Sequence, residues 1–302
     1  MSDGCAYHRS VTDEVPGSVP SPDHAELFAG HLSPVDLSTG GRAAAFFDLD
    51  KTILARSSAF AFARPFYQGG LIGRSDLLRS AYAQFVYLVS GADHDQMEQM
   101  RAYMSALCSG WEVERVRQIV AETLDTVVDP LVYAEAVELI DEHRAAGRDT
   151  IVISSSGTEL VEPIGARLGV DLAIGTQLAI DDGRYTGEIL FYAYGEGKAE
   201  AMRALAAERG YDLAACYAYS DSQTDLPMLE LVGHPVATNP DAELRRVAAE
   251  RDWPIRDFAR PVALRSTRAA RARRRTAVGA AVGAAAVGVA WYAARRVTRT
   301  HG

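Results

Sequence analysis

The sequence has few of the residues that stabilise secreted proteins or bind soft metals. Its 302 residues include three cysteines, Cys5, Cys108 and Cys216, which are too scattered for a disulfide framework or a thiolate metal site. Residues 1–41 contain no apolar run of the length found in secretory signals. They are rich in Pro, Ser, Asp and Gly without apolar periodicity, and we expect a disordered tail there. These absences together favour a reducing, cytoplasmic environment.

Lysine is scarce as well, and the charges are distributed unevenly. Lys51 and Lys198 are the only lysines among 31 basic residues. In a chain that otherwise uses arginine, a lysine indicates a place where a compact ammonium is needed. The net charge is −9, yet from residue 255 onward eleven arginines face one acid, Asp257. The acidic body argues against nucleic acid as a partner, and the basic end favours an anionic membrane surface.

Two carboxylates stand close together after the first apolar stretch, FFDLDKTIL at residues 46–54. The stretch begins as a buried strand and then presents Asp48 and Asp50. Because residues i and i+2 of a strand share a side, these carboxylates would repel each other unless a cation or a proton intervened. The stretch is therefore a candidate for chemistry, or a simple turn.

Three further polar clusters follow apolar stretches or open predicted helices. The run Ile151–Ile153 breaks into Ser154 and Ser155, GEGK at 195–198 places Lys198 at a helix start, and the strand 216–219 ends in SDSQTD with Asp221 and Asp225. Taken alone, each has a structural explanation: a serine-rich turn, a surface charge and a helix N-cap. Backbone N–H groups at such strand-to-helix junctions also bind anions.

The order of predicted elements indicates an α/β fold. Strand, helical block, strand, helix, hairpin at 178–190, helix, strand, helix and strand together predict a doubly wound, mainly parallel, Rossmann-like sheet. Within the helical block 58–146, apolar residues recur at helical spacing: Val116, Ile119, Val120 and Leu124, then Tyr133, Val137 and Ile140. Ligands of such sheets bind at the carboxyl ends of strands, where the polar clusters fall.

DLDKT, the serine after IVI, the lysine of GEGK and the acids of SDSQTD, in this order, resemble the four motifs of the haloacid dehalogenase-like (HAD) hydrolase superfamily. A long helical insert after the first motif is similar to the phosphoserine phosphatase-like branch, subfamily IB. The resemblance covers about residues 43–258 and implies a core at 42–57 and 147–262, with a helical cap at 58–146. The remaining segments are the tail 1–41 and a basic tail 263–302.

The resemblance also implies roles for the motif residues. Asp48 would be the nucleophile that forms an aspartyl-phosphate, and Asp50 the general acid and base. Mg²⁺ would be held by Asp48, the Asp50 carbonyl and Asp221. Phosphoryl oxygens would be bound by Thr52, Ser154, Ser155, Lys198 and Thr224. Asp225 would support the metal site by orienting a water on the ion or Lys198, and Lys51 receives no catalytic role.

One departure from the branch bears on the substrate. In phosphoserine phosphatases an acid nine residues after the nucleophile receives the substrate ammonium, and here that position is Ser57, preceded by Arg56. Thr224 likewise stands where those enzymes usually carry Asn. We therefore expect a small or lipid-derived phosphomonoester other than phosphoserine.

The last apolar run, residues 276–294, predicts an apolar C-terminal helix and an anchor. It holds no charge for 19 residues, has arginines on both sides, and is dominated by Ala and Gly. Its length suits a single transmembrane helix, although its weak hydrophobicity also suits a peripheral one. The heavier arginine load before it places the catalytic part on the cytoplasmic side, and Gly279 and Gly283 offer a helix-pairing face for a homodimer.

Three alternatives remain open at this stage. A phosphoserine phosphatase would need another acid for the ammonium. A membrane-tethered regulatory module without turnover would need a damaged motif, and none is visible. A phosphotransferase or dehalogenase could use the same nucleophile, although Asp50 argues against dehalogenation because a halide needs no general acid.

Overall fold

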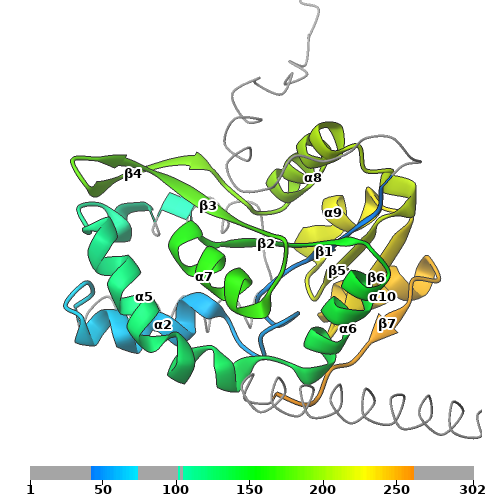
Figure 1. Cartoon of the computed structure of the whole chain (residues 1–302), viewed down its shortest axis with the longest axis horizontal. Coiled ribbons are helices and arrows are strands. Elements are labelled where there is room, and N and C mark those ends of the chain that lie inside the picture. Colours follow the sequence, from blue (N-terminus) through cyan, green and yellow to red (C-terminus); the bar gives the residue numbers. More distant parts are fainter. Residues whose placement is uncertain (1–41, 74–100, 103–104, 262–302) are drawn as a thin grey trace, which may run out of the picture.

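A seven-stranded sheet forms the centre of the protein, seen in a computed structural model that describes residues 42–73, 101–102 and 105–261 (Figure 1). The strands are β1 (Ala44–Phe47), β2 (Asp149–Gly157), β3 (Leu172–Asp181), β4 (Arg184–Phe191), β5 (Tyr217–Ser220), β6 (His234–Thr238) and β7 (Ile255–Arg256). Their order is β4-β3-β2-β1-β5-β6-β7. All neighbours run parallel except β3 and β4, which form an antiparallel hairpin. The mainly parallel α/β sheet is thereby confirmed.

Helices cover both faces of the sheet (Figure 1). They are α2 (Ser58–Gln68), α5 (Val113–Val127), α6 (Ala134–Ala145), α7 (Thr158–Leu168), α8 (Glu196–Arg209), α9 (Leu226–Glu230) and α10 (Ala242–Glu250). Short 3₁₀ helices are η1 (Asp129–Leu131), η2 (Leu213–Ala215) and η3 (Gln223–Asp225). The chain leaves β1 toward β2 on one side and later returns to β5 on the other, so β1 and β5 flank a topological switch point.

Alternating residues of the central strands fill two separate cores. Phe46 contributes to one core with α8, α9 and α10, and Phe47 contributes to the other with α5, α6 and α7. Strands buried on both faces read as continuous apolar runs, which explains the run Ile151–Ile153. The hydrophobic face predicted for the helical block is confirmed, since its α5 members are buried.

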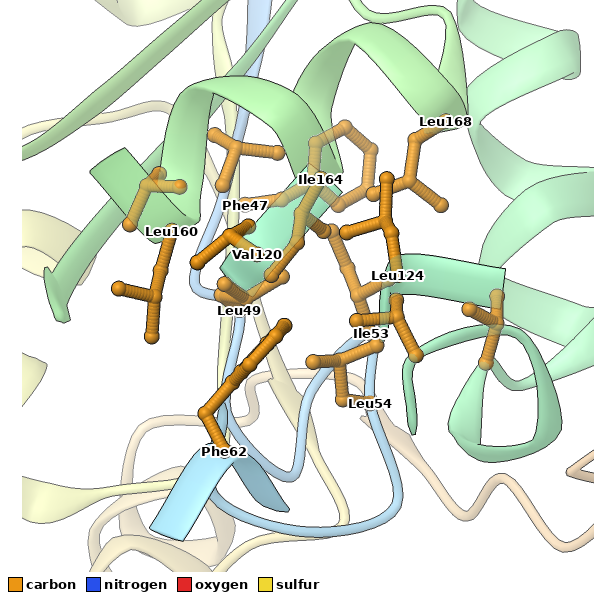
Figure 2. Close-up of a cluster of buried hydrophobic side chains, with 14 of the residues drawn as sticks. Phe47, Leu49, Ile53, Leu54, Phe62, Val120, Leu124, Leu160, Ile164 and Leu168 are labelled. Atoms are coloured by element: carbon orange, nitrogen blue, oxygen red, sulfur yellow. The ribbon is translucent and has the colours of Figure 1, made fainter. Parts of the chain in front are cut away.

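The second of these cores also anchors the loop that follows β1. Leu49, Ile53 and Leu54 are fully buried, and Figure 2 shows them among side chains of α2, α5 and α7. Burial of each such side chain is worth roughly 1.5–3 kcal/mol. These buried side chains therefore hold in place the loop that carries the Asp48 and Asp50 carboxylates.

The helical segments between β1 and β2 have two different attachments. α2 packs on α5, and α5 packs on α7, so this pair lies outside the helix layer (Figure 1). By contrast, α6 contacts β1 and β2 directly. The cap predicted at 58–146 thus includes α6, a helix that packs on the sheet. The division into core and cap stays a prediction.

Local details differ from the sequence-based expectations in small ways. The hairpin turns at Asp182 and Gly183 as predicted, with Asp181 paired to Arg184. α8 begins at Glu196, so Lys198, predicted at the helix start, is its third residue. α7 begins at Thr158 with Gly157 as its N-cap, and no side chain makes a capping hydrogen bond there.

Three predictions concern residues outside the described part. These are the disordered tail 1–41, the apolar helix 276–294 and the pairing face at Gly279 and Gly283. Among the residues that the structure describes, no helix is long and apolar enough to cross a bilayer.

Candidate active site

Asp48 lies one residue beyond β1, at the carboxyl end of the sheet. Its backbone N–H donates to the Tyr219 carbonyl at 2.9 Å, which extends the pairing of β1 with β5 by one residue. Asp48 is 6% exposed, and it lines a cavity. Strand pairing therefore sets the position of this carboxylate.

A tight loop carries the chain from Asp48 to α2. The N–H groups of Ile53 and Leu54 both donate to the Leu49 carbonyl, at 3.0 and 2.9 Å. Lys51 adopts a left-handed conformation with φ of 60°, and its carbonyl accepts a hydrogen bond from Asn239 Nδ2. A non-glycine residue with this φ carries some backbone strain.

Asp50 lines the same cavity and also holds the start of α2. Its Oδ1 accepts the Ser58 N–H at 2.8 Å. The buried Ser58 hydroxyl pairs with the Ser156 hydroxyl at 2.7 Å, which ties α2 to the end of β2. Sequence reasoning did not identify Ser58 or Ser156, and only the serine run at the end of β2 pointed toward the second of them.

The side-chain ammonium of Lys198 lies at the centre of the site. It is 3% exposed, and its Nζ donates to Asp48 Oδ1 at 2.6 Å and to Asp225 Oδ2 at 2.7 Å. Asp225 Oδ2 also accepts the Ser220 hydroxyl at 2.6 Å. A Cβ on Gly197 would lie 2.1 Å from the Tyr192 carbonyl oxygen, so the close approach that places Lys198 requires glycine in GEGK.

Asp221 stands at the end of β5 and is 6% exposed. Lys51 Nζ lies 3.7 Å from its Oδ2, which brings the second lysine of the chain to the cavity as well. Thr224 also lines the cavity, and its hydroxyl pairs with the Ser222 hydroxyl at 3.0 Å. The acids of SDSQTD and DLDKT are therefore brought together by the neighbouring ends of β1 and β5.

The structure separates the serines and threonines that were predicted to bind phosphate. Ser155 is exposed and lines the cavity, whereas Ser154 is fully buried and its Oγ accepts the Ser156 N–H at 3.3 Å. Thr52 is 1% exposed, and its hydroxyl is buried without a hydrogen-bond partner among the described residues. Ser154 and Thr52 are not among the described residues that line the cavity. Ser156 also lines the cavity, so of the three consecutive serines only Ser154 is excluded from it.

The site carries more negative charge than the protein neutralises. Burial raises the pKa of Asp48 to about 7, and the Lys198 ammonium acts in the opposite direction. Burial likewise raises the pKa of Asp50 and, together with the neighbouring Asp48 carboxylate, that of Asp221. Buried carboxylates with raised pKa values occur where a cation or a proton completes the site.

This donor set fits a hard divalent cation. Mg²⁺ takes oxygen ligands and uses one or two carboxylates, with substrate and water completing its octahedral shell. Asp48 and Asp221 supply buried carboxylates at adjacent strand ends. Their raised pKa values indicate that a cation bound there would stabilise the charged carboxylates. Within the described part of the chain, no group of three His, Cys, Asp or Glu side chains could hold a metal by itself. An ion here would need the substrate and a backbone carbonyl as further ligands.

The cavity has a volume of about 350 Å³ and extends from the carboxylates toward α2 and the β3–β4 hairpin. It brings together seven of the predicted residues: Asp48, Asp50, Ser155, Lys198, Asp221, Thr224 and Asp225. Convergent charged groups at the carboxyl ends of parallel strands are typical of an enzyme site at a switch point.

Comparison with known proteins gives relatives over most of the chain. A Streptomyces azureus protein named "Inhibition of morphological differentiation protein" is 58% identical over 261 residues, which cover 84% of this chain and 94% of that protein. A "probable phosphatase" of Mycobacterium tuberculosis is 53% identical over 266 residues, 87% and 93% of the two chains. A phosphoserine phosphatase of the same organism is 37% identical over 270 residues, 88% and 83% of the two chains.

Solved structures agree on the fold. A protein with unknown function from Bordetella pertussis matches with a TM-score of 0.64 and 29% identity, over 72% of this chain and 99% of that one. A substrate-bound phosphoserine phosphatase matches with a TM-score of 0.54 and 19% identity, over 74% and 96%. The family model of the haloacid dehalogenase-like hydrolases matches residues 45–230. With most of the motif residues gathered at one cavity and phosphatases among its relatives, the chain belongs to the haloacid dehalogenase-like hydrolases.

Proposed function

We propose that this protein is a Mg²⁺-dependent phosphomonoester hydrolase that works through an aspartyl-phosphate intermediate. The observation that carries the proposal is the buried Lys198 ammonium, held between Asp48 and Asp225 at the carboxyl end of the sheet. Such an arrangement fixes a nucleophile beside a positive charge, which is what transfer of a dianionic phosphoryl group requires.

The reaction proceeds in two displacements at phosphorus. Lys198 binds Oδ1 of Asp48, so Oδ2 is the oxygen that attacks; its bond to phosphorus forms while the bond to the leaving alcohol oxygen breaks. Asp50, whose pKa is raised by burial, donates its proton to that oxygen. Asp50 then takes a proton from water, which attacks phosphorus and releases phosphate and the free Asp48 carboxylate.

The remaining residues of the site position the phosphoryl group. Ser155, Lys198 and Thr224 line the cavity and would donate hydrogen bonds to the phosphoryl oxygens. Ser220 and Asp225 act through Lys198, because the Ser220 hydroxyl orients the Asp225 carboxylate that binds the ammonium. Thr52 and Ser154, which the cavity does not include, would support the loop and the strand end.

Mg²⁺ would be held by the carboxylates of Asp48 and Asp221 and the carbonyl of Asp50. When bound, the ion neutralises charge on the phosphoryl oxygens and lowers the repulsion between the substrate and the carboxylates.

We propose a small or lipid-derived phosphomonoester as the substrate, not phosphoserine. Ser57 lines the cavity where related phosphoserine phosphatases place an acid, and its Oγ accepts the Phe60 N–H at the start of α2. A hydroxyl in that role cannot neutralise an ammonium. The relative named phosphoserine phosphatase favours phosphoserine as the second candidate.

Two further elements of the proposal rest on the sequence. The arginines around residues 276–294 would bring the enzyme to the cytoplasmic face of an anionic membrane. Pairing of two chains through Gly279 and Gly283 would follow if that segment forms a helix in the bilayer.

Replacement of the nucleophile tests the reaction. We expect Asp48→Asn to lower Mg²⁺-dependent phosphate release by about 10⁴-fold or more, because an amide is a poor nucleophile. Phosphate release is measured on a panel of phosphomonoesters with and without Mg²⁺, and circular dichroism checks the fold. Asp182→Asn, an equal change at the exposed tip of the hairpin, is the control and should leave turnover unchanged. Retention of more than roughly a tenth of the activity by Asp48→Asn would contradict the mechanism.

A further inference from the structure

The cavity continues beyond the carboxylates into a region with largely apolar walls. We call this region the apolar chamber; its lining includes Phe60, Phe66, Trp111, Leu178, Tyr185 and Ile189. These residues come from α2, from the segment before α5 and from the β3–β4 hairpin. None of them takes part in the phosphoryl chemistry proposed above.

Backbone contacts hold the walls of the apolar chamber together. The Tyr185 N–H donates to the Trp111 carbonyl at 3.1 Å, and the Gly110 N–H donates to the Tyr185 carbonyl at 2.8 Å. The Phe66 and Trp111 rings meet edge to face with centroids 5.6 Å apart. Segments distant in the sequence are thus pinned into one preformed wall, and little ordering is left for a ligand to impose.

Away from the four aspartates of the phosphoryl site, the cavity walls offer a cationic ligand no acid without an ion-pair partner among the described residues. Glu159 lines the cavity, but its carboxylate lies 3.8 Å from Arg117 Nη2, so it is already part of an ion pair. Arg101 also lines the cavity, with its guanidinium 5.8 Å from the ring centroid of Tyr192. An ammonium on the part of the substrate that enters the apolar chamber would therefore find Glu159 already ion-paired with Arg117.

We propose that the apolar chamber receives the leaving group of the substrate, and that this group is an uncharged apolar body such as an aromatic ring or a short alkyl chain. The cavity of about 350 Å³ is at the lower end of the roughly 300–1,000 Å³ typical of small-molecule sites. Phosphoserine would leave most of these apolar walls in contact with water. The inference rests on the proposed phosphatase function and specifies its substrate class.

A homologous series of substrates tests the inference. With methyl, butyl and hexyl phosphate, we expect kcat/KM to rise by up to about fourfold per methylene until the apolar chamber is filled. Phenyl phosphate should exceed glycerol phosphate and phosphoserine. Equal kcat/KM along the series, or a preference for phosphoserine, would overturn the inference while leaving the phosphatase proposal standing; no Mg²⁺-dependent release from any ester would overturn the phosphatase proposal itself.

Two adjacent residues of β4 provide a matched pair of variants. Ile189 lines the cavity, whereas Leu190 is 49% exposed and is not among its lining residues. We expect Ile189→Asn to lower the preference for hexyl over methyl phosphate, the ratio of their kcat/KM values, by at least about fivefold. Leu190→Asn should leave this ratio unchanged. The same ratio in all three proteins would contradict the assignment of the apolar chamber.

Binding provides a readout that does not depend on turnover. Methyl-, butyl- and hexylphosphonate cannot be hydrolysed, and titration calorimetry measures their Kd. We expect Kd to fall along the series for the parent protein and for Leu190→Asn, and to fall less for Ile189→Asn. If chain length has no effect on Kd in the parent protein, the apolar chamber does not bind the leaving group, whether or not the protein hydrolyses phosphomonoesters.

Discussion

Lys198 occupies a space that suits an ammonium and no larger cation. Its Nζ donates at 2.6 and 2.7 Å to the carboxylates of Asp48, which follows β1, and Asp225, which lies in η3, and the side chain is 3% exposed. A guanidinium is planar and broader, so it would displace one of the two carboxylates. The side chain at residue 198 must therefore match the site in the shape of its cationic group as well as in its charge.

We predict that Lys198→Arg lowers kcat/KM for phosphate release by about 100-fold or more although the charge is kept. Steady-state kinetics with and without Mg²⁺ measure the loss. Arg203→Lys, on the exposed face of the same helix, is the control, since Arg203 pairs only with Glu196 in the contacts described. Activity of Lys198→Arg close to that of the parent would show that the site does not need a compact ammonium.

At the scale of elements, His143 joins α6 to the sheet. The Arg148 Nε–H donates to His143 Nδ1 at 2.7 Å, so the proton of the neutral ring is on Nε2, which donates to the Tyr219 hydroxyl at 2.8 Å. His143 is 2% exposed. Burial, and then the positive charges of Arg148 and Arg256, lower the pKa of His143 to about 4.

This lowered pKa predicts a loss of stability in mild acid. Between pH 6.5 and 4 the unfolded chain binds a proton at His143 and the folded chain does not, so the free energy of unfolding falls as the pH falls. The full effect is about 3 kcal/mol. Denaturant unfolding of the parent and of His143→Gln at several pH values measures it. We expect the His143→Gln curve to be flatter, and parallel curves would contradict the prediction.

At the scale of the whole molecule, the charges separate into an acidic body and a basic end. Residues 276–294, which lie outside the described part, form an uncharged run with arginines on both sides. Each arginine near an anionic surface contributes about 1 kcal/mol to membrane binding. We therefore predict that the full-length chain associates with membranes and that a chain ending before Arg271 does not.

Fractionation tests this prediction and separates two modes of attachment. High-salt and carbonate washes release a helix held by charge, whereas a spanning helix stays until detergent is added. Recovery of the full-length chain in the low-salt supernatant, at the same level as the shortened chain, would remove the membrane from the proposal.

The sequence by itself determined the class of fold and the edge of the sheet where the site lies. Apolar runs of strand length and helical periodicity are local properties, so the order of the elements could be read from them. The spacing of Asp48 and Asp50 and the glycines around Lys198 were also local patterns. They pointed to the carboxyl ends of strands, where the structure brings these residues together.

Tertiary structure decided what depends on the facing of side chains and on contacts between distant segments. Ser154 and Ser155 are alike in sequence, and only the orientation of β2 makes one of them line the cavity and buries the other. The hydroxyl pair of Ser58 and Ser156 joins residues 98 positions apart. The apolar chamber likewise combines three segments that are distant from one another in the sequence. Local patterns do not encode which distant surfaces meet, because that outcome depends on packing of the whole chain.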